Sequence, residues 1–493
     1  MDPIRFVDTT LRDGQMSLWA CEMRTGMMLP ALRYLDEAGF DGMEFFVPSV
    51  QIRNMIRELH EDPWKWLRLG SERIRKTPLR MTGGYRGGLS KIPTQAGKLL
   101  VKTVIGYGVR ICRLSDWWND FEVLRQEFED LRNMGMDAVV NLIYTVSPRH
   151  TDAYYVERAQ AAAALAPHRI CFKDVGGLLT PERIRDLAPK IISAVGNIPI
   201  EFHGHCNNGL GPVNVLEAVK SGIRIVNCAI PPLANGSSNP SLFAAVRNLR
   251  SLGYECQIDE QVLRPVEEHF TRIARLENLP IGVPSEYDQS VYMHQVPGGM
   301  ISNMRHQLKA IGMEHRLQET LEESARVRAE LGYPIMVTPL SQFVGSQAAI
   351  NVMTGERYKQ VTDEVIRYAL GHWGREAVKV MDPDVRAMIL NRPRGTELMN
   401  WETPEPSLAE LRHKYGENLS DEQLLLRIYG GDDALEIARA QGEPIEYVPQ
   451  GRPLIELLKQ LAQCEKRTSI SLSNANFSLT LKRNTEGTTA VSV

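Results

Sequence analysis

The first 250 residues alternate short apolar or β-branched runs with longer segments of helical spacing, and this alternation limits the fold more than any other feature. Between the runs lie segments such as residues 27–39 and 180–196, which have helical spacing and a glycine near the end. Alternating β and α segments require a parallel α/β architecture. Eight runs have the character of buried strands: Ile4–Asp8, Gly42–Phe46, Pro78–Thr82, Val109–Leu114, Ala138–Tyr144, Arg169–Lys173, Pro199–His203 and Arg224–Ile230.

Eight β/α repeats over about 250 residues have the size of a closed barrel. A doubly wound open sheet is the alternative, but it would place a glycine-rich phosphate loop after the first strand. The segment after Asp8 is not of that kind. We therefore predict an α/β protein whose residues 1–255 form a catalytic (β/α)8 TIM barrel.

The strand pattern fades after about residue 260, where helical stretches such as 264–278 and 315–331 take over. From residue 467 onward, Ser and Thr alternate with apolar residues, which predicts one or two strands. The barrel is thus expected to be followed by a mostly helical domain over residues 256–465. This domain would complete the active site and contact partners, and a short β-rich tail would occupy residues 466–493.

Composition excludes several classes of protein. The net charge of −3 gives no reason to expect a nucleic acid or an anionic membrane as partner. The N-terminal sequence lacks the pattern of a signal peptide, and no run of about 18 apolar residues could span a bilayer. The seven cysteines are scattered without a Cys-x-x-Cys pair, which argues against a disulfide framework and a cysteine zinc site. We expect a reduced, cytoplasmic protein.

Ionisable residues gather where the predicted barrel strands end, which is where such barrels build their active sites. Arg12 and Asp13 follow the first strand, Lys173 ends the sixth, and His203 and His205 end the seventh. A His-x-His pair on a strand places both imidazoles on one face. Each feature alone has a simpler explanation, such as a helix cap for Asp13. Together they predict a site for a divalent cation.

These motifs resemble a known group of enzymes. DTTLRDG together with His-x-His is similar to the metal-dependent barrel superfamily of isopropylmalate synthase, hydroxymethylglutaryl-CoA lyase and the biotin-dependent carboxyltransferases. FKDVGGLLTP resembles the lysine segment of the carboxyltransferases in pyruvate carboxylase, oxaloacetate decarboxylase and transcarboxylase, and the condensing and cleaving relatives have no lysine there. Similar segments continue to about residue 395: LHEDPWKWLR, YTVSPRHT, QVPGGMISNM and VTPLSQFVGSQAAINVM.

The resemblance implies a metal centre ligated by Asp13, Lys173, His203 and His205, with Arg12 among the catalytic residues. Lys173 would be carboxylated on its amine, since an ammonium cannot ligate a cation whereas a carbamate offers an anionic oxygen. With mixed nitrogen and oxygen ligands we favour Zn²⁺, with Mn²⁺ or Co²⁺ as alternatives.

The resemblance also implies the chemistry. Ser302 matches a hydroxyl residue that relays a proton between substrate and biotin. Arg113 matches the arginine that holds the substrate's carboxylate and oxyanion, although a structural ion pair would also explain it, and Asp116 matches an aspartate of the same strand end. Carboxybiotin would release CO2, and the metal and Arg113 would stabilise a substrate enolate that attacks it.

The sequence departs from its relatives around the acceptor. Met16 stands where they have a glutamine, so the neighbouring Gln15 is the candidate contact for the substrate carbonyl. The segment TGGYRGG lacks their second arginine at its usual place, which leaves Arg86 as its substitute. Trp117 and Trp118 are bulkier than expected. We predict weak carboxylation of pyruvate and a preference for a less anionic or larger carbonyl compound, with pyruvate and oxaloacetate still the leading pair.

Partners follow from the same resemblance. The sequence has no biotin-attachment motif such as Ala-Met-Lys-Met and no glycine-rich ATP-grasp loop. Biotin is therefore expected on a separate carrier protein, with a separate biotin carboxylase subunit where biotin must be carboxylated, and the chain is expected to form a homodimer or higher oligomer. Two rival functions remain: a metal-dependent aldol-type lyase or synthase, and a non-catalytic assembly subunit.

Overall fold

The computed structural model describes most of the chain and contains two compact units, Met1–Pro444 and Ile445–Val493. Each unit is considered by itself. The described residues are 2–85, 92–296, 301, 304–305, 308–309, 311–400, 402, 404–447, 469–474, 477–483 and 489–492.

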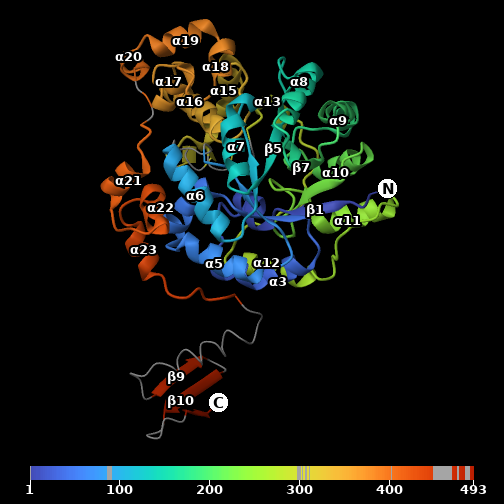
Figure 1. Ribbon diagram of the computed structural model, residues 1–493, viewed down its shortest axis with the longest axis vertical. Coiled ribbons are helices and arrows are strands. Elements are labelled where there is room, and N and C mark those ends of the chain that lie inside the picture. The colour runs from blue at the N-terminus through green and yellow to red at the C-terminus, as the bar shows by residue number, and fades with distance from the viewer. Residues whose placement is uncertain are drawn as a thin grey trace. The chain divides into compact units, whose positions relative to one another are not determined.

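The centre of the first unit is a closed barrel of eight parallel strands, in which each strand pairs with the next and the eighth pairs with the first (Figure 1). The TIM barrel predicted from the sequence is confirmed, and all eight predicted runs are strands whose ends lie within two residues of the prediction. The strands are β1 (Arg5–Asp8), β2 (Gly42–Phe46), β3 (Leu79–Thr82), β4 (Ile111–Leu114), β5 (Asp137–Ile143), β6 (Arg169–Asp174), β7 (Ile200–Gly204) and β8 (Ile225–Cys228).

Helices surround the barrel, and capping residues explain where they begin and end. In α9, Thr180 accepts a hydrogen bond from the backbone N–H of Arg183, Pro181 occupies the first turn, and Gly196 ends the helix at a φ of 65°. The outer helices are α1 (Gln15–Leu18), α2 (Thr25–Met28), α3 (Leu32–Glu37), α4 (Pro48–Asn54), α5 (Pro63–Arg73), α6 (Thr94–Gly106), α7 (Arg125–Asn133), α8 (Asp152–Ala163), α9 (Pro181–Val195), α10 (Gly211–Lys220) and α11 (Leu242–Ser251).

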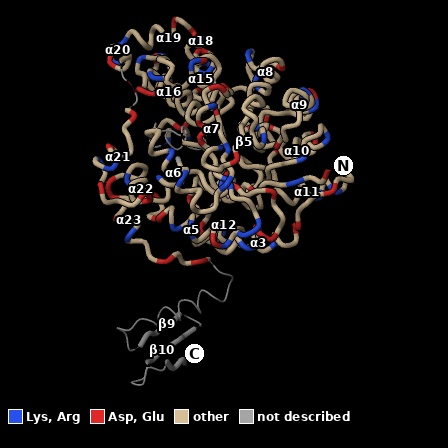
Figure 2. Tube along the Cα trace, in the orientation of Figure 1, with Lys and Arg blue, Asp and Glu red and all other residues tan. Residues whose placement is uncertain are grey.

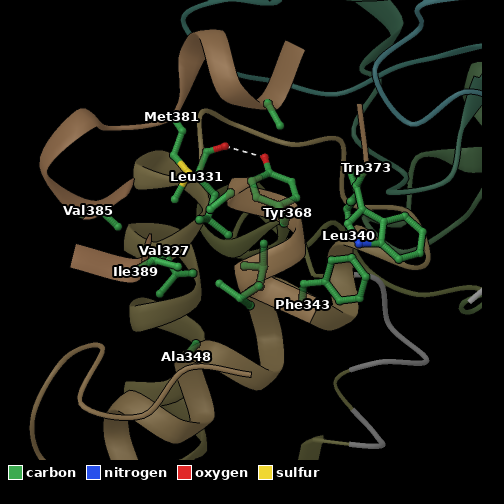
Figure 3. Close-up of a cluster of buried hydrophobic side chains, with 14 of the residues drawn as sticks. Val327, Leu331, Leu340, Phe343, Ala348, Tyr368, Trp373, Met381, Val385 and Ile389 are labelled. Carbon is green, nitrogen blue, oxygen red and sulfur yellow. Dashed lines mark hydrogen bonds between the residues drawn. The ribbon is translucent and has the colours of Figure 1, made fainter. Parts of the chain in front are cut away.

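The chain after the barrel is helical as predicted, and its middle part has a hydrophobic core of its own (Figure 3). Leu331, Phe343 and Ile389 are among the buried side chains of this core, and the Tyr368 hydroxyl donates to the carbonyl of Leu331 at 2.5 Å. The helices are α12 (Arg264–Leu276), α13 (Val291–His294), α15 (Leu317–Glu330), α16 (Leu340–Thr354), α17 (Asp363–Ala369), α18 (Arg375–Val380), α19 (Pro383–Leu390), α20 (Pro393–Met399), α21 (Leu408–Tyr415), α22 (Asp421–Gly430) and α23 (Ala434–Ala440).

The last three of these helices return to the barrel instead of extending the helical core. Helix α22 packs against α4 and α6 (Figure 1). The Trp64 indole donates to the carbonyl of Glu422 at 3.0 Å, the Tyr107 hydroxyl donates to the Glu422 carboxylate, and Arg57 donates to the carbonyl of Gly430. Residues 408–440 therefore cover outer helices of the barrel.

Charged residues lie on the barrel strands as well as on the outer helices (Figure 2). Arg80 on β3 reaches Glu201 on β7 through two hydrogen bonds of 3.0 and 2.8 Å. Both side chains are fully buried. Partners on strands three and seven can meet only across the barrel interior, so polar contacts replace part of the branched apolar layers usual in such barrels.

The second unit contains a three-stranded antiparallel sheet in the order β11-β10-β9. Its strands are β9 (Ser469–Asn474), β10 (Phe477–Arg483) and β11 (Thr489–Ser492), one more than the sequence pattern indicated. The predicted boundaries after residues 255 and 465 remain predictions. Among the described residues, no helix combines the length and apolar composition that crossing a membrane requires. The six described cysteines are free and buried.

Candidate active site at the mouth of the barrel

Three of the predicted metal ligands meet at the carboxyl ends of the barrel strands. Asp13 lies in a π-helical turn, η1 (Thr10–Gly14), directly after β1, while His203 and His205 belong to the end of β7. One oxygen of Asp13 is 3.0 Å from Nε2 of His203 and 3.5 Å from Nε2 of His205. All three ligand atoms lie within 4.8 Å of one another and all three residues are buried. This donor set suits a divalent cation.

The far side of each imidazole is held by a hydrogen-bond partner. Nδ1 of His203 lies 3.0 Å from the side-chain oxygen of Asn227, and Nδ1 of His205 lies 2.7 Å from the carbonyl of Ser237. The carbonyl at Nδ1 of His205 favours the tautomer in which Nε2 keeps its lone pair, which is the tautomer that binds a metal. Nδ1 of His203 also lies 3.3 Å from Nη1 of Arg113, which can only donate. Burial and Arg113 lower the pKa of His203 to about 3 against the opposing effect of Asp13, so this ring is neutral.

Lys173, the fourth predicted ligand, pairs in register with His203 on the adjacent strand. Residues paired in register on adjacent parallel strands lie on the same face of the sheet, so the side chain of Lys173 points into the barrel, as that of His203 does. Burial, Arg113 and Arg12 lower the pKa of Lys173 to about 7, while Asp13 acts in the opposite direction. The lysine therefore stands among cations, where an ammonium is disfavoured.

Two arginines at the site share one carboxylate. Glu44 on β2 is fully buried, contacts Arg12, and lies 2.7 Å from Nη1 of Arg113. Arg12 also lies 2.8 Å from Asp13. Burial would raise the pKa of Glu44, but the arginines hold it below the ordinary value. Glu44 is therefore a carboxylate that fixes both arginines.

Arg113 is anchored through only one of its nitrogens. Nη1 donates to Asn227 at 3.0 Å and faces Glu44. Nε and Nη2 are buried and have no hydrogen-bond partner among the described residues. These two nitrogens present parallel N–H bonds, the arrangement in which a guanidinium binds a carboxylate through two hydrogen bonds. The structural ion pair considered from the sequence is present, and it leaves this pair of donors available.

The other predicted substrate contacts have different surroundings. Asp116 accepts hydrogen bonds from the backbone N–H groups of Trp118 and Asp120 at 2.7 and 2.8 Å, so it holds the loop after β4. Burial raises the pKa of Asp116 to about 6 despite these donors. The side-chain amide of Gln15 donates to the carbonyl of Leu11 within its own turn. Neither residue is brought to Arg113 by a described contact, and both remain candidates.

Arg86 and Ser302 lie outside the described residues.

The tryptophan pair packs differently from the sequence interpretation. Trp118 is buried in the helical core and donates to the carbonyl of Trp373 at 2.9 Å. Trp117 donates to the carbonyl of Thr338 and packs edge-on against Trp373, with ring centroids 5.3 Å apart. The pair joins the barrel to the helices because the loop held by Asp116 turns both indoles that way.

Sequence reasoning missed Glu44 and Asn227. Both stand inside otherwise apolar strand runs, GMEFF and IVNC, and a polar residue in a buried strand was an available signal. Their partners come from distant strands, so their roles could not be deduced from the spacing.

Comparisons with known proteins identify the family of this chain. The HMGL-like family model matches residues 3–269, and the conserved carboxylase domain model matches residues 291–470. A pyruvate carboxylase subunit of Methanocaldococcus jannaschii is 36% identical over 79% of this chain and 68% of the relative. The 2-oxoglutarate carboxylase large subunit of Hydrogenobacter thermophilus is 31% identical over 89% and 69%, respectively.

A solved structure has the same fold. The carboxyl transferase domain of Rhizobium etli pyruvate carboxylase, solved with pyruvate, superposes with a TM-score of 0.80 at 22% identity, and the match covers 100% of this chain and 86% of that chain. The barrel, its site and these matches define a carboxyltransferase of the HMGL-like barrel class. The chain belongs to the family of biotin-dependent carboxyltransferases that includes the pyruvate carboxylase subunit of M. jannaschii.

Proposed function

We propose that this chain transfers a carboxyl group between carboxybiotin on a separate carrier protein and a small 2-oxo acid, with pyruvate and oxaloacetate as the leading pair. The observation that carries the proposal is that Nε and Nη2 of Arg113, which have no partner among the described residues, occur in the same barrel mouth as three residues that could hold a cation. A 2-oxo acid has a carboxylate that can bind the two Arg113 nitrogens and a carbonyl oxygen that can face the cation. Both features act where negative charge develops in an enolate.

Charge balance supports carboxylation of Lys173. At the site, Arg12, Arg113 and a protonated Lys173 face the carboxylates of Asp13 and Glu44, which leaves one positive charge in excess. A divalent cation would raise this excess to three in a buried volume, which is unfavourable. A carbamate on Lys173 replaces a cation with an anion and lowers the excess by two. The fourth ligand and the charge compensation would then come from the same group.

The chain's own residues divide the remaining work. Asp13, His203 and His205 would hold the cation, which supplies a positive field at the carbonyl oxygen when bound. Arg113 would bind the acceptor's carboxylate, and Ser302 would relay the proton between the acceptor's methyl carbon and biotin. Zn²⁺ is our preferred metal, with Mn²⁺ or Co²⁺ as alternatives.

The further parts of the proposal concern assembly. The carrier protein would deliver biotin to the barrel mouth, and a separate biotin carboxylase subunit would load it. We propose a homodimer or higher oligomer.

The test follows carboxyl transfer from a carboxylated biotin carrier to pyruvate, and the reverse reaction from oxaloacetate. We expect transfer by the wild-type chain, loss of transfer and of bound metal in Lys173→Gln, and no change in Lys379→Gln, which alters an exposed lysine of α18. Biotin-independent cleavage of a 3-hydroxyacyl compound, without any carboxyl transfer, would instead support the aldol-type rival.

A further inference from the structure

The carboxyl ends of β3, β4 and β5 form another side of the barrel mouth, here called the wall. Its polar side chains are mostly hydroxyls and amides, unlike the candidate metal ligands Asp13, His203 and His205. Thr82 on β3 pairs in register with Arg113 on β4. Arg80, two residues before Thr82, reaches across the lumen to Glu201, so Thr82 points into the barrel as well. Asn141 on β5 donates from Nδ2 to the Ser115 hydroxyl at 2.6 Å.

Polar atoms on this wall have unused hydrogen-bonding capacity. Oγ1 of Thr82 and Oδ1 of Asn141 are buried without a hydrogen-bond partner among the described residues, as are Nε and Nη2 of Arg113. Asn141 and Arg113 are fully buried as residues. Buried polar groups are normally paired, so the donors of Thr82 and Arg113 on adjacent strands point to a bound molecule with acceptor oxygens, whereas the Asn141 oxygen can only accept.

Among the described residues at the ends of these three strands, only one side chain carries a positive charge. Arg113 supplies it, and the flanking groups on β3 and β5 are a hydroxyl and an amide. A first carboxylate can bind Arg113 through two hydrogen bonds. Against the described groups of β3 and β5, a second carboxylate would be buried beside a hydroxyl and an amide and no further cation, which is costly, and the Asn141 oxygen, which has no partner among the described residues, would face it as an acceptor.

We propose that Thr82 and Asn141, which flank Arg113, form a neutral acceptor subsite that selects a 2-oxo acid with one carboxylate over a 2-oxo acid with two. This inference rests on the proposed function, since it concerns the acceptor of the same reaction. The carboxyl group that is transferred faces biotin and is not the group selected here. Among the relatives, the chain would resemble in its acceptor the pyruvate carboxylase and not the 2-oxoglutarate carboxylase.

The experiment measures binding and turnover separately. Calorimetry with pyruvate, 2-oxobutyrate and 2-oxoglutarate, in the absence of carboxybiotin, reports on the subsite, and carboxyl transfer to the same acids reports on the function. We expect the wild-type chain to bind both one-carboxylate acids at least about tenfold more tightly than 2-oxoglutarate, as for one lost or repulsive polar contact.

The variants isolate the groups on the wall. Thr82→Val should weaken pyruvate binding about tenfold, Thr82→Ser should remain within about threefold of wild type, and Thr82→Lys should shift the preference toward 2-oxoglutarate by about tenfold. Asn141→Asp should weaken binding of every acid through repulsion. Thr103→Val, which removes a hydroxyl from outer helix α6, is the matched control and should bind as wild type does.

Two outcomes would overturn the subsite: tighter binding of 2-oxoglutarate than of pyruvate by the wild-type chain, or wild-type affinities in both Thr82→Val and Thr82→Lys. Selective binding without any carboxyl transfer would support the subsite and contradict the proposed function. Equal binding of all three acids, together with equally efficient carboxyl transfer to all three, would support the proposed function and contradict the subsite.

Discussion

At the residue scale, the site depends on a small number of side chains whose removal should have separable effects. Ser302 is expected to relay a proton and to make no contribution to the metal site. Ser302→Ala should therefore keep folding and bound metal but lose carboxyl transfer by roughly a hundredfold or more, since general acid–base groups contribute factors of that order. Metal analysis and transfer assays check this, with Ser71→Ala on outer helix α5 as control. Near wild-type turnover in Ser302→Ala would show that the proton takes another route.

His150 gives a pH dependence that does not involve the metal site. Its ring packs edge-on against Tyr154 and lies 2.6 Å from the Ser147 hydroxyl. Burial and the neighbouring arginines, Arg328 foremost, lower the pKa of His150 to about 3 from 6.5. Between pH 6.5 and about 3, His150 is therefore protonated in the unfolded chain but neutral in the folded chain. The free energy of unfolding should fall by up to about 1.4 kcal/mol for each pH unit below 6.5.

Urea unfolding at pH 7, 6 and 5 tests this expectation. His150→Gln should flatten the fall in stability toward pH 5, whereas His413→Gln should not, because His413 is exposed on α21. An unchanged pH slope in His150→Gln would mean that other groups cause it.

At the element scale, Gln295 ties the end of α13 to the chain segment after β5. Its side chain accepts from the Thr145 hydroxyl at 3.0 Å and donates to the carbonyl of Val146 at 2.8 Å. Arg328 on α15 donates to the same two groups at 3.0 and 3.1 Å. Ser302 follows Gln295 by seven residues in the sequence, so we expect loss of these contacts to affect the proton relay.

Gln295→Ala should destabilise the first unit by about 1–3 kcal/mol through unpaired buried groups and should also lower kcat for transfer. Gln347→Ala is the matched control, because Gln347 is equally buried in α16 and makes hydrogen bonds only within the helical part. It should lose stability without the selective loss of kcat. Equal kcat effects in the two variants would mean that Gln295 acts only through stability.

The elements were largely predictable from the sequence, and the side-chain partnerships were not. The period of the apolar runs predicted all eight strands, and the His-x-His motif with Asp13 predicted three residues that do lie together. The contacts of Trp117 and Trp118 were not predictable, because the direction of a loop side chain depends on packing against residues over 200 positions away in the sequence. The contact between Glu44 and Arg113 joins strands that are not neighbours, so no local pattern encodes it.

At the scale of the whole molecule, a cation bound by Asp13, His203 and His205 would connect β1 with β7 and stabilise the folded chain through mass action. Chelation should therefore lower Tm by several degrees, and re-addition of Zn²⁺ or Mn²⁺ should restore it. In His205→Ala, chelation should leave Tm unchanged. Differential scanning calorimetry measures both, and an equal shift in the variant would place the stabilising ion elsewhere.

The ion pairs in the barrel lumen also bear on how such a chain can change over time. Replacing either Arg80 or Glu201 alone breaks the hydrogen-bonded contact between two buried charges. Arg113 and Arg169 lie farther from Glu201, at 3.9 and 3.8 Å, so the loss costs up to about 3–5 kcal/mol, which is comparable with a domain's whole stability. A new residue at either position is therefore accessible only through an intermediate that barely folds. Thr82, one layer above Arg80, has no such partner among the described residues. New acceptor preferences in this barrel should therefore arise by single substitutions at the rim, over a lumen that stays as it is.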